Sequence, residues 1–314
     1  MLGGDLVTRV AAVDCGTNSI RLLIAEPNGS GGLRDLDRRL EIVRLGQGVD
    51  ASGEFHVDAL RRTFAVVDQY AELIKKADVP VANVHFVATS AARDARNRDS
   101  FFAGIKQRLG VLPDVISGAT EAHLSFVGAL SRINPEGEPV LVMDIGGGST
   151  ELITGSAAGE MYSAISLDIG SVRVTERFLR QNPVAADDLA LAAEYVDDLL
   201  ADSGVEFASI GTWIGVAGTA TTLAGVYLEL EHYDREQVHG AVIPLPALQE
   251  LLHRLAQMTV EEIRALPSMH PGRADVITGG ALIEARIAAR LNGGDLIVSE
   301  SDILDGIALR LIHR

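Results

Sequence analysis

Residues 10–23 read VAAVDCGTNSIRLL and residues 140–153 read VLVMDIGGGSTELI, so one pattern occurs twice at an offset of 130 residues. Each copy is an apolar run ending in aspartate, then a glycine-containing turn, then a second apolar run. This pattern predicts a β-hairpin whose tip carries a carboxylate, a hydroxyl and backbone N–H groups. Because glycine lets a ligand approach the backbone and successive amides bind anions, we expect phosphate at each tip. Two such tips predict two halves facing each other across one phosphate.

The composition favours a two-domain α/β protein. A chain of 314 residues is long for one core, and 47% hydrophobic residues suffice for two cores. Alternating strand and helix patterns indicate the α/β class. The net charge of −16 argues against nucleic acid or an acidic membrane surface as a partner. The single cysteine, Cys15, cannot form an internal disulfide, which fits a reducing cytoplasm.

Neither a secretory signal nor a membrane span is expected. The N-terminal apolar run is short and is broken by Asp14. The uncharged run 208–228 is long enough to span a bilayer, but its glycines and threonines favour a strand, a turn and a helix. We place the first domain at 1–125 and the second at 126–299.

The second tip is the strongest local signal. Asp144 ends an apolar strand and is followed by Gly146, Gly147, Gly148 and Ser149. A carboxylate in this position can hold a hard divalent cation, while the amides and the hydroxyl hold phosphate. The plain alternative is a hairpin with a generous turn. Glu151 either joins the metal shell or is a solvated strand residue.

The first tip offers a matching phosphate site. Its residues are Asp14, Gly16, Thr17, Asn18 and Ser19. Arg21 lies on the same face of its strand as Ser19, because strand side chains alternate with a period of two. Arg21 therefore faces the ligand and adds a positive charge, or it lies on the solvent side.

Glu121 lies in SGATEAHLSF (117–126), in the first turn of a predicted helix. An acid at this position is stabilised by the helix dipole and needs no other role. It can also act as the general base that takes a proton from water attacking phosphorus. Arg93, with Arg96 and Arg98 nearby, is either a solvated arginine or part of a phosphate clamp.

The stretch GVAGTATTLAG (215–225) predicts a turn rich in glycine and threonine that leads into a helix. Such a turn can hold a nucleotide through its amides and hydroxyls, and as a motif it is weak. The candidate nucleotide-binding residues are Gly218, Thr219 and Thr221.

Taken together, these motifs resemble the exopolyphosphatase and guanosine-pentaphosphate phosphohydrolase (Ppx/GppA) family of the sugar kinase–Hsp70–actin superfamily. The stretches that carry the resemblance follow the order of the family. They are DCGTNSIRLL (14–23), ATSAARDARN (88–97), SGATEAHLSFVGA (117–129), DIGGGSTEL (144–152) and GVAGTATTLAG (215–225).

The resemblance implies two ribonuclease-H-like (actin-like ATPase) domains with an interdomain cleft, and a last helix at 300–314 that packs back on the first domain. It implies that Glu121 is the catalytic base and that Arg93 contacts phosphate. It also implies Mg2+ (or Mn2+) associated with the carboxylates Asp14, Asp144 and Glu151. The chain resembles the family's short form, which lacks further helical domains.

One departure from the family lies at Asp305-Gly306, where an Arg-Glu-Gly triplet is more usual. The change removes a positive charge and argues against processive action on long polymers.

The predicted function is a cytoplasmic phosphohydrolase that releases the terminal phosphate of inorganic polyphosphate, or the 5′ γ-phosphate of guanosine pentaphosphate, by attack of water activated by Glu121. A homodimer is expected because dimers are common in the family, and no nucleic-acid or membrane partner is expected. Two alternatives stay open: a small-molecule kinase of the same superfamily, and a non-catalytic sensor of guanosine tetraphosphate or pentaphosphate.

Overall fold

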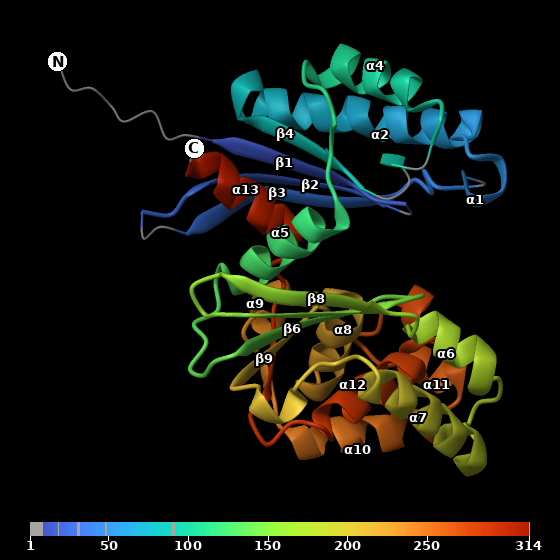
Figure 1. The fold of residues 1–314 in the computed structure, drawn as a ribbon. Coiled ribbons are helices and arrows are strands. Elements are labelled where there is room, and N and C mark those ends of the chain that lie inside the picture. The colour runs from blue at the N-terminus through green and yellow to red at the C-terminus, as the bar shows by residue number, and fades with distance from the viewer. Residues whose placement is uncertain are drawn as a thin grey trace. The chain divides into compact units, whose positions relative to one another are not determined.

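The computed structural model describes residues 9–313 except 18, 30, 31, 48, 90, 91 and 94, and only the backbone of residues 50 and 51. The chain forms two compact units, shown in Figure 1. The first takes the described residues up to Ser131 together with those from Asp302 onward, and the second spans Arg132–Ser301. The last segment of the chain therefore belongs to the same unit as the first strands.

The sheet of the first unit has the strand order β3-β2-β1-β4-β5. Strands β1, β2 and β3 form an antiparallel meander, and β4 and β5 run parallel to β1. Strand β1 is buried throughout its length, as its apolar run predicts, and Asp14 near its end is buried with it. The strands are β1 (Val10–Cys15), β2 (Ser19–Pro27), β3 (Leu33–Ile42), β4 (Val84–Ala88) and β5 (Asp114–Val115).

Helices cover both faces of this sheet, α2 and α4 on one side and α5 and α13 on the other (Figure 1). Helices α5 and α13 cross so closely that a Cβ on Gly128 would lie 1.8 Å from the Asp302 carbonyl oxygen, and one on Gly306 would lie 2.1 Å from that of Leu124. Glycine at both positions lets the two backbones meet. The helices are α1 (Val49–Ser52), α2 (Val57–Lys76), α4 (Arg98–Leu109), α5 (Gly118–Leu130) and α13 (Ile303–Ile312), with a 3₁₀ turn at Val81–Asn83.

The second unit repeats this arrangement. Its sheet has the order β10-β11-β9-β6-β7-β8, in which β8-β7-β6-β9-β11 matches the five strands of the first unit. Strand β10 is an additional edge strand, antiparallel to β11. The strands are β6 (Val140–Ile145), β7 (Thr150–Gly155), β8 (Met161–Leu167), β9 (Thr212–Val216), β10 (Val242–Ile243) and β11 (Leu296–Val298).

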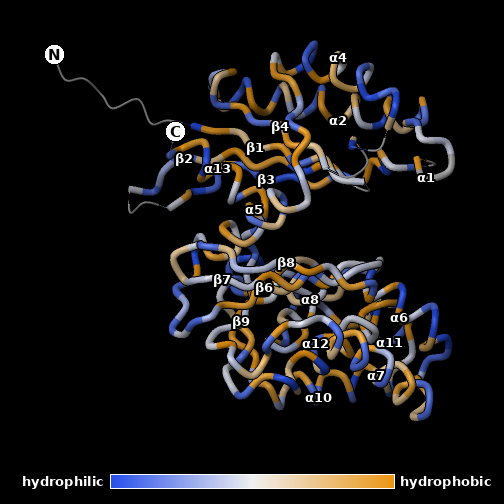
Figure 2. Tube along the Cα trace, viewed as in Figure 1, coloured by the Kyte–Doolittle hydropathy of each residue, from blue (hydrophilic) through white to orange (hydrophobic). Residues whose placement is uncertain are grey.

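The core of the second unit is built around α12, which is buried along almost its whole length. The tube in Figure 2 is coloured by hydropathy. In it α12 is mostly apolar, whereas α7 is richer in polar residues. The helices are α6 (Ser171–Phe178), α7 (Ala186–Ala201), α8 (Ala217–Tyr227), α9 (Arg235–Val238), α10 (Leu245–Ala256), α11 (Val260–Arg264) and α12 (Ile277–Ala288), with 3₁₀ turns at Phe207–Ser209 and Pro271–Arg273.

The uncharged run 208–228 forms strand β9 and helix α8, as its glycines and threonines predict. Across the described residues, every helix is too short or too polar to cross a membrane.

Candidate functional site

Both predicted hairpins form, and their tips share one backbone geometry. In the first, the Gly16 N–H donates to the Ser19 carbonyl oxygen at 3.0 Å, and in the second the Gly146 N–H donates to that of Ser149 at 2.9 Å. The cross-strand partners are also equivalent: Asp14 lies opposite Arg21, and Asp144 opposite Glu151. The repeat seen in the sequence is therefore a repeat in structure.

In each unit the tip lies at the carboxyl ends of parallel strands. Strands β1, β4 and β5 run in the same direction, so the segments that follow them, with Asp14, Arg93 and Glu121, belong to one edge of the first sheet. In the second unit β6 and β9 are parallel, and the Thr219 hydroxyl donates to the Ile145 carbonyl oxygen at 2.9 Å. Ligands of α/β proteins bind at this edge.

The glycines of the second tip fit a close backbone contact. None of Gly16, Gly146, Gly147 and Gly148 lies in the left-handed region, so their conformation alone does not require glycine. The Gly147 carbonyl oxygen instead accepts the N–H groups that begin α6, and a Cβ on Gly170 would lie 2.4 Å from that oxygen. Gly147 and Gly148 are exposed, and no hydrogen bond among the described residues uses their N–H groups. These two N–H groups are open to an anion.

Arg21 on the first hairpin is held by two carboxylates. Its Nη2 and Nε donate to Asp14 Oδ2 at 2.6 and 3.1 Å, and its Nη1 donates to Asp302 Oδ2 at 2.5 Å. The Arg21 side chain is one quarter exposed. This is intermediate between the two orientations considered from sequence, toward the ligand and toward solvent. A ligand anion at this tip would meet a guanidinium that already has acid partners.

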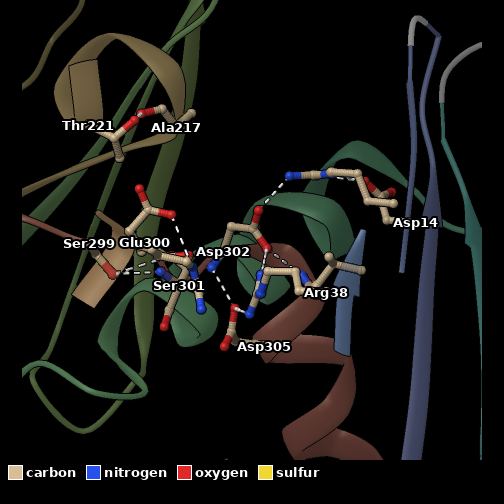
Figure 3. Close-up of polar contacts among 12 residues, drawn as sticks. Asp14, Arg38, Ala217, Thr221, Ser299, Glu300, Ser301, Asp302 and Asp305 are labelled. Carbon is tan, nitrogen blue, oxygen red and sulfur yellow. Dashed lines mark hydrogen bonds and ion pairs between the residues drawn. The ribbon is translucent and has the colours of Figure 1, made fainter. Parts of the chain in front are cut away.

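Figure 3 shows the network that continues from Asp302. Arg38 of β3 donates to Asp305 Oδ2 at 2.7 Å and lies 3.5 Å from Asp302 Oδ1. Asp302 is also the N-cap of α13, and its side chain accepts the Leu304 N–H. Sequence reasoning missed Asp302 and Arg38. The capping pattern Asp302-x-x-Asp305 is readable, but an arginine partner 264 residues away is not.

Burial has the largest effect on the pKa of the Asp14 carboxyl. Desolvation raises its pKa above the ordinary value, and the Arg21 guanidinium opposes this rise. Asp14 Oδ2 is used by Arg21, whereas Oδ1 is buried and has no hydrogen-bond partner. One carboxylate oxygen therefore remains for a cation or a bound water.

Glu151 on the second hairpin is oriented by hydroxyls instead of an arginine. Its Oε1 accepts from Ser149 Oγ at 2.7 Å and from Ser166 Oγ of β8 at 2.8 Å. Glu151 and Asp144 lie directly opposite each other in the ladder, where like charges are destabilising. Among the described residues no lysine or arginine pairs with Glu151, so this tip collects negative charge. Ser166 was not predicted from sequence.

Glu121 and Arg93 come together in the first unit. Arg93 Nη1 lies 3.5 Å from Glu121 Oε2 and donates to the Ile116 carbonyl oxygen at 2.6 Å. Ser117 caps α5 as expected, and its side chain accepts the Thr120 N–H. The Glu121 side chain is 37% exposed, so it can reach water. Its place in the first turn also fits the dipole explanation.

The candidate nucleotide-binding residues at the start of α8 already use their side chains. Thr219 and Thr221 are more than nine-tenths buried, and the Thr221 hydroxyl donates to the Ala217 carbonyl oxygen at 2.9 Å (Figure 3). A Cβ on Gly218 would lie 2.4 Å from Arg273 Nη2, and Arg273 Nη1 donates to the Gly218 carbonyl oxygen at 2.8 Å. A ligand here would meet backbone more than these hydroxyls.

The remaining predictions concern Asn18 and the metal ligands. Asn18 lies outside the described residues. Outside the gaps given above, no three His, Cys, Asp or Glu side chains gather in a way that could hold a metal ion.

Two repeated α/β units, each with a glycine turn and a carboxylate at the end of its first strand, define an actin-like fold. The model of the Ppx/GppA phosphatase family matches residues 23–314, so the chain belongs to that family. The family resemblance, the α/β actin-like fold class and the assignment to the hydrolases are thereby confirmed.

Similar proteins match over nearly the whole chain. Exopolyphosphatase 2 of Mycobacterium tuberculosis is 46% identical over 97% of this chain and 99% of its own. The type II variant structure of the Aquifex aeolicus Ppx/GppA phosphatase has a TM-score of 0.88 at 30% identity, covering 97% of this chain and 99% of that one. An exopolyphosphatase from Cytophaga hutchinsonii has a TM-score of 0.76 at 27% identity, covering 95% and 96%.

Proposed function

We propose that this phosphatase releases the terminal phosphate of inorganic polyphosphate, or the 5′ γ-phosphate of guanosine pentaphosphate, in a reaction that needs a divalent metal. The similarity to Exopolyphosphatase 2 favours polyphosphate. The observation that carries the proposal is the pairing of Glu121 with Arg93 on the same sheet edge as the first glycine turn. This pairing brings an acid and an arginine together on the unit that carries the first glycine turn.

Each glycine turn would bind a phosphoryl group through its amides. The open N–H groups of Gly147 and Gly148 supply neutral donors that favour an anion without neutralising it completely. On the first turn we assign the same role to Gly16, Thr17, Asn18 and Ser19, with Arg21 beside them. Positioning and neutralisation of charge provide most of the catalysis in phosphoryl transfer.

The side chains fit Mg2+ or Mn2+, which prefer oxygen ligands. Asp144 and Glu151 face each other across the second hairpin, and Asp14 Oδ1 is a buried acceptor without a donor. Asp144 and Glu151 would hold the ion on the second unit, with Asp14 as the corresponding carboxylate of the first unit, and the ion would neutralise charge on the phosphate oxygens. Because Ser149 and Ser166 both donate to Glu151 Oε1, the carboxylate is already oriented before a ligand binds.

Glu121 would take the proton of the attacking water. Arg93 holds its carboxylate from one side, and more than a third of the side chain is exposed to solvent, where the water enters. The proton passes from water to a Glu121 oxygen while the water oxygen bonds to phosphorus and the bond to the leaving phosphate breaks.

A phosphate-release assay with Mg2+ tests the proposal on short polyphosphate, long polyphosphate, guanosine pentaphosphate and ATP. Glu121→Gln should lower the rate on the order of 10²–10⁴-fold. Asp99→Asn is the matched control, because Asp99 is the acid in the first turn of α4 in the same unit. Loss of activity in both variants would indicate that Glu121 only stabilises its helix through the dipole. An unchanged rate in Glu121→Gln would remove Glu121 from the mechanism.

The second candidate function is a sensor of guanosine tetraphosphate or pentaphosphate. The buried hydroxyls of Thr219 and Thr221 leave little side-chain chemistry for a nucleotide, which favours the hydrolase. Tight nucleotide binding without phosphate release at any metal concentration would reverse this choice. Membership of a phosphatase family likewise supports hydrolysis over transfer by a kinase.

A cytoplasmic location and a homodimer complete the proposal. Light scattering of the purified protein would measure the assembly state.

A further inference from the structure

A hollow of about 670 Å³ adjoins the second glycine turn. Besides Gly147 and Gly148, its lining contains three arginines, Arg173, Arg177 and Arg180, with Val172 and one acid, Glu176. Three cations against one carboxylate is unusual for a chain with a net charge of −16. The hollow is therefore a local positive site on an acidic protein, and it lies within one unit.

The arginines lie on one side of α6 and the segment after it. Arg173 and Arg177 are four residues apart in α6, a spacing that places side chains on one helix face, and Arg180 follows the end of the helix and lines the same hollow. Arg173 is nearest to the turn, because its Nε donates to the Gly148 carbonyl oxygen at 2.8 Å. The cations thus follow one another away from the turn.

Neutral partners hold the guanidinium groups of Arg177 and Arg180. Arg177 stacks on the Tyr195 ring at 4.4 Å and on Phe178 at 5.3 Å. Arg180 Nε donates to the Glu176 carbonyl oxygen at 2.9 Å. Arg173 has a carboxylate partner in addition to the Gly148 carbonyl oxygen: Asp168, 3.4 Å from Arg173 Nη2 and 85% exposed. Arg177 and Arg180 are therefore held without being neutralised, so binding an anion costs little side-chain entropy.

We propose that these three arginines form a track for the phosphate units that follow the one bound at the glycine turn, so that the substrate is a polyphosphate chain. The inference rests on the proposed function. A chain carries charge on every unit, which matches a row of cations, whereas a nucleoside needs an open apolar or aromatic face. The nearest rings, Tyr195 and Phe178, are covered by Arg177. The track supplies positive charge, whereas the arginine that is more usual in the family is missing at Asp305-Gly306.

The test compares long with short substrates in the double variant Arg177→Gln/Arg180→Gln. Arg173 is left unchanged because it supports the turn. The matched control is Arg254→Gln/Arg264→Gln, which removes the same charge from α10 and α11 of the same unit. The preference in kcat/KM for long polyphosphate over tripolyphosphate and guanosine pentaphosphate should fall on the order of tenfold or more in the track variant, and stay at the wild-type value in the control.

Two further measurements separate the possible outcomes. Arg177→Lys/Arg180→Lys keeps the charge and should recover part of the preference, and thermal melting should show that each variant folds. Direct binding of long-chain polyphosphate in a Glu121→Gln background should weaken with the track variant, and less steeply with salt.

An unchanged preference, or an equal loss on every substrate, would overturn the track. Failure of the wild-type protein to release phosphate from any substrate would instead overturn the proposed function, and the binding experiment would still decide whether the track holds polyphosphate.

Discussion

The two hairpins share strand register and turn geometry, yet they treat charge in opposite ways. At equivalent positions the first has Arg21 opposite Asp14, and the second has Glu151 opposite Asp144. The first is therefore neutralised within its own unit, and Asp302 adds a second carboxylate to the same guanidinium. The second places two acids together and orients Glu151 with serine hydroxyls. The same backbone geometry thus carries an acid–arginine pair at the first tip and two acids, an arrangement that favours a cation, at the second.

The same contrast extends into the interior of the units. Buried Asp305 in the first unit accepts from Arg38 at 2.7 Å. Buried Glu284 of α12 in the second unit has neither oxygen hydrogen-bonded, and burial raises its pKa to about 8. Asp305 is matched with an arginine, whereas burial without a partner favours the neutral form of Glu284.

The largest effect is expected at the tip of the second hairpin, which carries Asp144 and Glu151. Glu151→Gln removes one of the two facing carboxylates and should lower the rate of phosphate release on the order of 10³-fold, with a raised Mg2+ requirement. Steady-state assays over a Mg2+ titration measure both. Glu160→Gln, an exposed acid before β8, should behave as wild type. A wild-type metal requirement in Glu151→Gln would remove the difference between the hairpins.

Glu284 predicts a dependence of stability on pH. In the unfolded chain this carboxyl ionises near its ordinary pKa of 4.5, whereas the folded protein keeps it protonated to about pH 8. The folded state then binds more protons, so its stabilising contribution is complete below about pH 4.5 and is lost as pH rises toward 8. The free energy of unfolding should fall by about 3 kcal/mol between about pH 5.5 and about pH 8 because of this group.

Urea unfolding at several pH values measures this slope, and Glu284→Gln should flatten it. Glu206→Gln, a glutamate at a 3₁₀ turn of the same unit, is the control and should keep the wild-type slope. Equal slopes in wild type and Glu284→Gln would show that Glu284 is ionised in the folded protein.

A smaller effect is expected in the arginine network of the first unit. Asp302→Asn preserves an N-cap side chain for α13 but removes the charge that faces Arg21 and Arg38. The free energy of unfolding should fall by about 1–2 kcal/mol, since the groups are only partly exposed. Asp234 is the N-cap of α9, and among the described residues its side chain bonds no arginine. Asp234→Asn should therefore change stability less. Equal losses in both would assign the effect to capping.

The smallest effect is expected from Ser166→Ala. It removes one of two hydroxyl donors to Glu151, so the metal affinity should weaken roughly threefold to tenfold while the fold is kept. Ser163→Ala on the same strand removes a hydroxyl that bonds Thr154 and should leave the metal affinity unchanged. A weaker affinity in both variants would indicate a general effect on β8.

Local patterns were sufficient to predict the two hairpins and the glycine turns at their tips, but not the edge strand β10. The repeat at 10–23 and 140–153 fixes both hairpins, because strand alternation and turn chemistry act over a few residues. The partners of those residues could not be predicted. Asp302 reaches Arg21 across 281 residues, and Ser166 reaches Glu151 through strand pairing, so each depends on the folded arrangement.

The reason for the glycines also required the structure. Sequence reasoning expected them to serve a ligand, whereas Gly147 also accepts the first N–H groups of α6 through its carbonyl oxygen. Sequence analysis did not single out Arg173, Arg177 and Arg180, and only the structure shows that they line a hollow beside that turn.

The central claim is that the acidic hairpin, and not the arginine-paired one, is the principal metal site. A crystal of Glu121→Gln grown with Mn2+ and tripolyphosphate locates the ion by its anomalous scattering. The account predicts Mn2+ within about 2–2.6 Å of Asp144 or Glu151 oxygens, with Arg21 still bonded to Asp14. Mn2+ bound at Asp14 with Arg21 displaced, and none beside Glu151, would contradict it.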